Sequence, residues 1–404
     1  MGGSANRRPH RQNARPALSG GRTMSQAMKG PLAGIRVVDF SKFLPGPYCT
    51  WLLADLGAEV IRIEHPRELA KQAQVFGWDK LSEAERARIR AADVFARGKR
   101  SLLIDPGADS SRPVLEELVR RADVLVEDYR PGVLAGMGYG YEAMAAINPR
   151  LVYASVTLCG QTGPYRDKPG HDPIALAVSG ALSRVGEDPE TPGFAGIPAA
   201  DLLTGSNAVI GVLAALLARA TTGRGQSVDI AMSDSSMALI ANVVSRNPDL
   251  SKAPPRGRHR ADIGIYRTAD GRFLVTTDME PRYWQRFCVA MGRPEYGPLQ
   301  NDKAARPEIR AYLEAEFAKQ PLAHWLASLA EADTQFAPIS SIEEALADPH
   351  NIERGMALTL DTPGGPVRQI GSPIHLSDTP PVPPRAARIA GADNDDIMKE
   401  LGLQ

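Results

Sequence analysis

The segment that decides the fold is GIRVVDF, residues 34–40, a short run rich in β-branched residues. It leads into a Pro-Gly-Pro turn at residues 45–47, after which residues 50–56 have the pattern of a helix that Gly57 ends. Residues 58–64 then have the composition of a second buried strand. Strand, helix and strand make a β-α-β unit, which requires a parallel sheet.

The alternation of strands and helices continues along the first half of the chain. Four further strands are predicted at residues 101–105, 124–128, 151–157 and 226–232. Helical patterns precede two of them, at residues 113–122 and 203–219. The sequence therefore predicts a doubly wound α/β domain over residues 31–230.

The residues beyond 230 differ in composition and pattern from the first part of the chain. A stretch rich in Pro and Arg at residues 247–260 predicts an exposed linker, and residues 264–277 predict a hairpin. Helices rich in Ala, Glu and Trp follow, so residues 231–330 are expected to form a smaller second domain. Residues 331–404 contain two Pro-Pro pairs and are expected to return over the large domain in extended form.

The composition is that of a globular protein without net charge. Of the 404 residues 43% are hydrophobic, and 47 basic side chains balance 47 acidic ones. No overall field therefore attracts nucleic acid or an anionic membrane. The longest apolar stretch, residues 208–218, is shorter than the roughly 18 residues of a membrane span.

The three cysteines, Cys49, Cys159 and Cys288, have neither metal-ligand nor disulfide spacing, which favours the cytoplasm and no metal site. We expect the basic residues 1–30 to be disordered, because they contain no acidic residue and no apolar periodicity. An organelle transit peptide with this composition is the alternative, as is a start at Met24.

Several common catalytic motifs are missing from the sequence. Gly136, Gly138 and Gly140 have neither dinucleotide-binding spacing nor the lysine of a P-loop, so we interpret them as turn residues. The chain contains no Gly-x-Ser-x-Gly and no His-Glu-x-x-His sequence. The common hydrolase and metalloprotease classes are therefore not supported.

Unusual residues are densest between residues 148 and 180, where PGHDP at residues 169–173 opens an apolar helical run. A helix N-terminus favours an anionic Asp and offers free N–H groups to an oxyanion. From the residues alone, Asp172 can equally be a helix cap and His171 a surface turn residue. Cys159 is interpreted as a packing residue because no neighbouring base would activate it.

Five motifs in order, at residues 31–39, 53–61, 129–132, 160–164 and 222–226, resemble the class III CoA-transferase family (CaiB/BaiF type), which includes α-methylacyl-CoA racemases. The resemblance spans residue 31 to the C-terminus. It implies an interlocked homodimer, with a Rossmann-like large domain and a small α+β domain in each chain. It also implies an acyl-CoA thioester as substrate, with no metal or redox cofactor.

The resemblance leaves two chemistries open. In the transferases, the Asp that matches Asp172 attacks the acyl-CoA to form a mixed anhydride and expels CoA thiolate. In the racemases, two bases flank the α-carbon of a 2-methylacyl-CoA, and the resemblance assigns these to His171 and Asp201, with Glu280 as a further carboxylate from the small domain. Two bases are needed because a single base would return the proton to the face it left.

Local sequence favours the racemase by a narrow margin, with the transferase as the alternative. Features that match racemases are His171, Leu176, the loop at residues 126–131, which lacks an Asn that many transferases carry, and the segment at residues 279–284. Residues 163–165 match transferases better, residues 173–175 depart from the racemase pattern, and residues 158–159 fit neither. A catalytically silent CoA-binding protein is a third possibility, disfavoured because His171, Asp172, Asp201 and Glu280 are all intact.

The resemblance also implies a set of CoA-contacting residues, with residues 170–175 lining the thioester site. The predicted set is His65, Asp105, Asp128, Tyr129, Arg130, Gly170 and Ala175. Two family arginines are replaced by His65 and Gly136, and Arg62 and Arg67 lie close enough in sequence to substitute.

Overall fold

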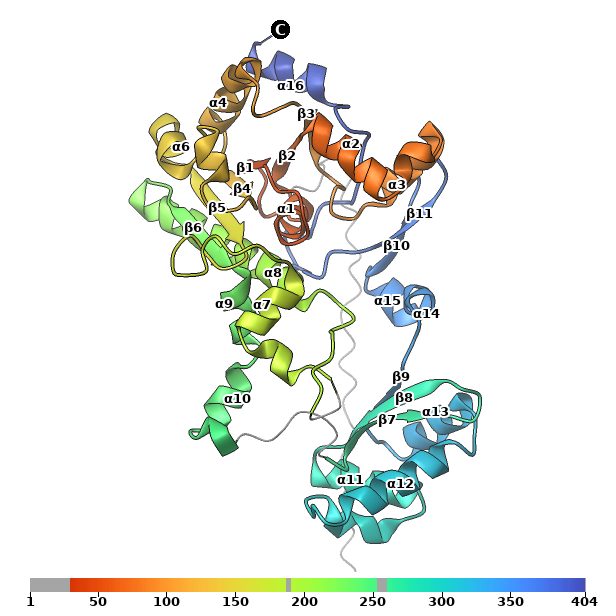
Figure 1. Cartoon of the computed structure of the whole chain (residues 1–404). Coiled ribbons are helices and arrows are strands. Elements are labelled where there is room, and N and C mark those ends of the chain that lie inside the picture. The colour runs from red at the N-terminus through yellow and green to blue at the C-terminus, as the bar shows by residue number, and fades with distance from the viewer. Residues whose placement is uncertain (1–29, 187–189, 253–259, 404) are drawn as a thin grey trace, which may run out of the picture.

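The computed structural model describes residues 30–186, 190–252 and 260–403, and the predicted extension at residues 1–30 lies almost wholly outside them. Its centre is a six-stranded parallel sheet in the order β3-β2-β1-β4-β5-β6 (Figure 1). The strands are β1 (Arg36–Asp39), β2 (Glu59–Glu64), β3 (Arg100–Leu103), β4 (Val124–Glu127), β5 (Val152–Thr157) and β6 (Ser227–Ala231). Each coincides with a predicted strand, and the order is that of the classic doubly wound fold. The predicted fold class is confirmed.

Successive strand residues point into two separate apolar cores, one on each face of the sheet. Val37 packs toward α1 (Pro45–Asp55) and α8 (Ala199–Thr222), whereas Val38 packs toward α4 (Arg112–Arg120) and α16 (Asn394–Leu401). In β4, Val124 belongs to the same core as Val37, and Leu125 belongs to the same core as Val38. Strands buried on both faces are continuously apolar rather than alternating, which is why GIRVVDF and its neighbours were recognisable in the sequence.

Helices cover both faces of this sheet. Those of the large domain are α1 (Pro45–Asp55), α2 (Pro66–Val75), α3 (Glu83–Ala92), α4 (Arg112–Arg120), α5 (Val133–Gly136), α6 (Tyr141–Ile147), α7 (Asp172–Val178), α8 (Ala199–Thr222), α9 (Met232–Ala238) and α10 (Ala241–Arg246). Gly57 ends α1 in a left-handed conformation with φ of 98°, and an added Cβ there would lie 2.9 Å from the Cα of Gly30. This close approach explains why the helix stops where the sequence predicts.

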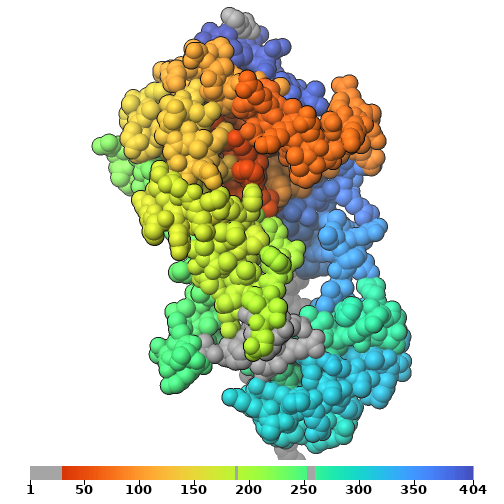
Figure 2. Space-filling model, in the orientation of Figure 1, coloured from red at the N-terminus to blue at the C-terminus, as the bar shows by residue number. Residues whose placement is uncertain are grey.

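The small domain is a three-stranded antiparallel sheet packed against helices. Its elements are β7 (Ile263–Arg267), β8 (Phe273–Thr277), β9 (Phe336–Pro338), α11 (Pro281–Ala290), α12 (Arg306–Phe317) and α13 (Leu322–Glu331). The β7–β8 pair confirms the predicted hairpin. An aromatic core that includes Trp284, Phe287 and Phe317 holds the domain together. The space-filling view shows the domain as a lobe of its own (Figure 2).

The small domain begins later and ends later in the chain than the predicted range of residues 231–330. Helix α9 follows residue 231 but packs against α7 and α8 of the large domain. Strand β9 pairs with β8, so the small sheet continues to Pro338. Part of the predicted linker at residues 247–260 lies outside the described residues.

The C-terminal segment returns to the large domain. Its elements are α14 (Ile342–Ala347), α15 (Pro349–Glu353), β10 (Ala357–Leu360), β11 (Val367–Ile370) and α16 (Asn394–Leu401). Val382 N–H donates to the carbonyl of Asp55, and Gly98 N–H donates to the carbonyl of Arg385. Because Asp393 also accepts from Ser101 N–H, the segment runs along the β3 edge of the sheet.

Helix α8 is the one helix among the described residues whose length and composition would allow it to cross a membrane. In the fold it packs against α1, β5 and β6 as part of the large-domain core. Its apolar character is therefore explained in part by burial of Val209, Val212 and Ala215.

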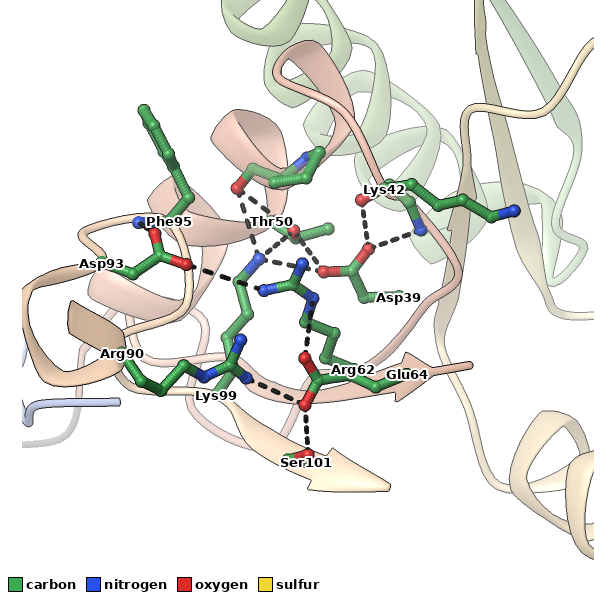
Figure 3. Close-up of polar contacts among 12 residues, drawn as sticks. Asp39, Lys42, Thr50, Arg62, Glu64, Arg90, Asp93, Phe95, Lys99 and Ser101 are labelled. Atoms are coloured by element: carbon green, nitrogen blue, oxygen red, sulfur yellow. Dashed lines mark hydrogen bonds and ion pairs between the residues drawn. The ribbon is translucent and has the colours of Figure 1, made fainter. Parts of the chain in front are cut away.

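A buried network of charges lies beneath the carboxyl ends of β1, β2 and β3 (Figure 3). Asp39 is fully buried and accepts hydrogen bonds from Thr50 Oγ1 at 2.6 Å and from Lys99 Nζ at 2.9 Å. Burial opposes ionisation of Asp39, but the positive charges of Lys99 and Arg62 hold its pKa below the usual value. Glu64, beside Arg62 and Arg90, extends the network across β2.

Removing the charge of Lys99 tests whether this network stabilises the large domain. We expect Lys99→Met to lower the free energy of unfolding by about 3–5 kcal/mol, because Asp39 would remain buried without its counter-ion. Urea unfolding followed by circular dichroism measures the change. Lys319→Met, which removes an exposed partner of Glu316, is the control and should cost less than about 1 kcal/mol. Equal losses in the two variants would contradict the expectation.

Candidate functional site

The carboxyl ends of β1 and β4 form the topological switch point of the sheet. From β1 the strand order runs to β2 and β3 on one side and to β4, β5 and β6 on the other. In open α/β sheets, ligands bind in the crevice at such a point. We call residues 40–44, which leave β1 at this crevice, the switch loop.

Carboxylates occupy the N–H groups of residues 41–43 in the switch loop. Ser41 N–H donates to Asp39 at 3.0 Å, Lys42 N–H donates to Asp128 at 2.9 Å, and Phe43 N–H donates to Asp128 at 3.0 Å. Helix α1 begins at Pro45 and has a second proline at Pro47, and prolines lack an N–H. The first β-α turn therefore offers few free donors to a dinucleotide pyrophosphate.

A cavity of about 450 Å³ opens beside the switch loop. Its lining combines the positive charges of Lys42, Arg62 and Lys71 with the carboxylates of Glu64 and Glu68. Leu69 of α2, with Val75 and Phe76 at the end of that helix, adds apolar surface. Figure 2 shows the β1–α1 segment, in red, at the bottom of a hollow bordered by the orange α2–α3 segment. Such a lining suits an elongated ligand with both anionic and apolar parts.

His65 and Asp105, both predicted to contact CoA, meet at the edge of this cavity. Nε2 of His65 lies 3.3 Å from Oδ1 of Asp105, while its Nδ1 accepts a hydrogen bond from Arg67 N–H at 3.1 Å. This geometry fixes the proton of a neutral His65 on Nε2, facing the carboxylate. Of the two arginines considered as substitutes, Arg62 lines the cavity and Arg67 does not.

The loop at residues 128–130 contains three residues that are predicted to contact CoA. They differ in their contacts and exposure. Asp128 accepts from the switch loop, as described above, and burial raises its pKa to about 6. Tyr129 lines the cavity, and its ring lies 4.0 Å from Lys42 Nζ, a cation–π distance. Arg130 is exposed.

The turn at residues 170–172 is shaped by close packing at Gly170. A Cβ on Gly170 would lie 2.8 Å from Cβ of Ile174 and 2.9 Å from a methyl of Leu158, so only glycine fits without displacement. His171 follows as an exposed residue, and its ring contacts the Phe43 ring edge-on with centroids 5.7 Å apart. The turn and the switch loop therefore touch.

Asp172 connects this turn to the start of α8. It is only 8% exposed, and its Oδ1 accepts from Ala200 N–H at 2.6 Å and from Asp201 N–H at 3.1 Å. Burial, followed by the charge of Asp172, raises the pKa of Asp201 to about 6. His171, Asp172 and Asp201 are thus brought together, and Asp201 can exchange a proton near neutral pH.

Two other predicted site residues, Glu280 and Ala175, differ in their surroundings from His171, Asp172 and Asp201. Glu280 occupies the N-cap position of α11 in the small domain without a side-chain capping bond, and it accepts from Gln335 Nε2 at 3.0 Å. Figure 1 shows α11 far from α7 within the chain. Ala175 is fully buried and packs in one apolar cluster with Leu176 and Ala200, so its side chain supports the turn from the protein interior.

Sequence reasoning did not identify Lys42, Phe43, Lys71 or Phe76 as site residues. The Pro-Gly-Pro turn marked a loop after β1, but no pattern showed which of its side chains face the cavity. Helix α2 has no buried residue, so it lacked the apolar stripe that would have drawn attention to it.

Comparisons with known proteins agree with this geometry. The profile of CoA-transferase family III matches residues 32–394. A succinate–glutarate CoA-transferase from Agrobacterium fabrum is 34% identical over 92% of this chain and 96% of its own length. An α-methylacyl-CoA racemase from Mus musculus is 32% identical over 92% of this chain and 93% of its own.

The fold has a close counterpart among solved structures. A CaiB/BaiF family protein from Brucella suis superposes with a TM-score of 0.78 and 30% sequence identity, over 92% of this chain and 100% of that one. Both the fold and the sequence match extend over the two domains and the returning C-terminal segment. The chain therefore belongs to CoA-transferase family III.

Proposed function

We propose that the protein epimerises the α-carbon of a 2-methylacyl-CoA thioester. The observation that carries the proposal is the Asp201 carboxyl group, whose pKa is raised to about 6 beside the His171 turn. A racemase needs two acid–base groups at the α-carbon, and the His171 imidazole and the Asp201 carboxyl group are the pair proposed here. Asp172, buried with one oxygen committed to two N–H donors, is better suited to shaping the site than to attacking a thioester.

The proposed reaction is a proton transfer in two steps. One base takes the α-proton, and the electron pair of the C–H bond moves into the thioester carbonyl to give an enolate. The other group then donates its proton to the opposite face of the α-carbon, and the carbonyl re-forms. No bond to sulfur breaks, so CoA leaves with the acyl group that it carried.

The CoA part of the substrate is proposed to occupy the cavity beside the switch loop. Lys42, Arg62 and Lys71 would supply positive charge to its phosphates. The thioester would then reach the turn at residues 170–172, since Phe43 lines the cavity and also touches His171. The reaction as proposed uses no metal or redox cofactor, and we propose the cytoplasm as its location.

CoA transfer between an acyl-CoA and a carboxylic acid is the second candidate. It is favoured by the relatives, because a succinate–glutarate CoA-transferase is as similar to this chain as a racemase is. Asp172 Oδ2 accepts no hydrogen bond from a described residue and could attack the thioester carbonyl. That attack would expel CoA thiolate and leave an anhydride on Asp172.

We further propose that the protein acts as an interlocked homodimer. Helix α11, which Glu280 precedes, lies far from α7, which His171 precedes, within one chain (Figure 1), so we propose that Glu280 joins the site from a second chain. Helix α8 also presents apolar side chains to solvent, with Ile210 63% and Leu217 74% exposed. A contiguous exposed apolar face of this kind is typical of a subunit interface.

Hydrogen exchange in heavy water distinguishes the two chemistries. We expect the wild-type enzyme to incorporate deuterium at the α-carbon of a 2-methylacyl-CoA. His171→Gln and Asp201→Asn should each slow racemisation at least about 100-fold, because general acid–base groups typically contribute that much. Mass spectrometry and chiral analysis of the acyl group give the two rates.

His324→Gln, a change at an exposed small-domain histidine, serves as the matched control and should leave exchange intact. The racemase proposal fails if no acyl chain incorporates deuterium. It also fails if His171→Gln retains full CoA transfer while Asp172→Asn abolishes it, which is the pattern expected of a transferase.

The pH dependence of exchange reports the Asp201 carboxyl group. Below its pKa of about 6 Asp201 is protonated and cannot accept the α-proton, so exchange in the direction that uses it as base should fall as the pH decreases through 6. Asp172→Asn removes a nearby negative charge, which lowers the pKa of Asp201 and moves this fall to lower pH. Asp167→Asn, at an exposed carboxylate, should not move it, and an unmoved profile in Asp172→Asn would contradict the assignment.

Mixed dimers test whether Glu280 serves the site of the other chain. His171→Ala and Glu280→Ala chains, each inactive alone, are co-expressed with different tags and purified through both. If Glu280 acts across the dimer, one site of each mixed dimer is intact and activity returns. If it acts within its own chain, both sites remain defective. Recovery of only single chains by light scattering would argue against the homodimer itself.

A further inference from the structure

The Asp128 carboxylate is the main attachment of the switch loop to the rest of the sheet. It sits directly after β4 and receives N–H bonds from consecutive residues of a loop that follows β1. Oδ2 also lies 3.0 Å from Lys42 N, so both oxygens face the same short stretch of backbone. The contact bridges the two strands between which the crevice opens.

A glycine and a cation–π contact support this bridge between Asp128 and the switch loop. A Cβ on Gly46 would lie 3.0 Å from Asp128 Oδ2, so glycine at that position leaves the carboxylate room to approach the loop. Lys42 then places its ammonium group over the ring of Tyr129, the residue after Asp128. The two segments are thus held together by backbone bonds and by side chains.

The bridge extends to the turn that carries His171. Phe43, whose N–H donates to Asp128, is 62% exposed, yet its ring meets the His171 ring edge-on at 5.7 Å and 73°. His171 shows no capping bond from its side chain to the start of α7. The Phe43 ring is therefore the neighbour best placed to orient the imidazole.

We propose that Asp128 is a positioning residue that holds the switch loop in place and, through the Phe43 ring, orients the His171 imidazole. The proposal rests on the proposed function for its catalytic consequence, but the positioning is a property of the free protein. It differs from the direct contact between Asp128 and CoA that the family resemblance implies. Asp128 would then act on catalysis without touching the substrate.

The negative charge of the Asp128 carboxylate suits it to positioning the switch loop. Burial raises its pKa to about 6 against the effect of the Lys42 and Phe43 N–H bonds, and the neighbouring charges are Asp39 and Lys42. The carboxylate is therefore ionised at pH 7.5, where an anionic acceptor makes stronger N–H bonds than a neutral one. An Asn at the same position could still accept from both N–H groups through the oxygen that replaces Oδ2.

The test follows the His171 signal and the reaction together. In histidine-labelled protein, the His171 Hε1 resonance, identified by its absence in His171→Gln, reports the ring current of Phe43. We expect Asp128→Ala and Phe43→Ala to displace this resonance in the same direction, and Asp128→Asn to displace it less. We also expect Asp128→Ala to lower kcat about 10- to 100-fold, the range typical of a displaced catalytic group, with a smaller change in the Kd for CoA measured by calorimetry.

A double variant and a matched control complete the experiment. Because Asp128 acts through Phe43, Asp128→Ala should add little to the loss already caused by Phe43→Ala. Asp123→Ala removes another carboxylate that accepts a backbone N–H, from Arg36 at the opposite end of β1, and should leave the His171 resonance in place. This control separates positioning from general loss of stability.

Three results would overturn the proposal: an unmoved His171 resonance in Asp128→Ala, an equal displacement in Asp123→Ala, or a full additional loss of activity in the double variant. Loss of CoA binding without displacement of the resonance would instead indicate direct contact with the ligand, and would also reject it. A wild-type protein that neither exchanges nor transfers would reject the proposed function alone, since the resonance is measured without substrate.

Discussion

The parallel pairing of β1 with both β2 and β4 is the constraint on which the rest of the structure depends. Parallel neighbours need crossover helices, and from β1 these crossovers run in opposite directions along the sheet. The loops after β1 and β4 therefore separate and leave a crevice that no helix fills. The cavity, the switch loop and the Asp128 bridge are all consequences of that separation.

Buried carboxylates lie at the switch point, in contrast to a dinucleotide site on the same sheet. Asp39 and Asp128 accept hydrogen bonds from the N–H groups of residues 41–43, and Glu127, with a pKa raised to about 7 by burial, directly precedes Asp128. Positive charge comes instead from β2 and α2, through Arg62 and Lys71. In the proposed binding mode, the anionic parts of the ligand would contact these side chains, and its uncharged reactive part would lie near His171.

Asp172 occupies a position that serves two chemistries in one family. Its hydrogen bonds to the start of α8 bring the His171 turn against Asp201, and its charge raises the pKa of Asp201. A buried carboxylate in this role costs free energy, which the N–H donors of α8 partly offset. Only Oδ1 takes part in these bonds, so the same carboxylate could also serve the second proposed chemistry through Oδ2.

The sequence by itself determined the strands, the β7–β8 hairpin and the turn at residues 170–172, because buried parallel strands and glycine-dependent turns leave local patterns. It did not reveal α2 as part of the site, since a helix without buried residues has no apolar stripe. Only the tertiary structure decided that Phe43 touches His171, that the N–H groups of Lys42 and Phe43 bind Asp128, and that α11 lies far from α7. Each of these facts joins segments distant in sequence, and the raised pKa of Asp201 depends on burial, which the three-dimensional packing of the chain creates.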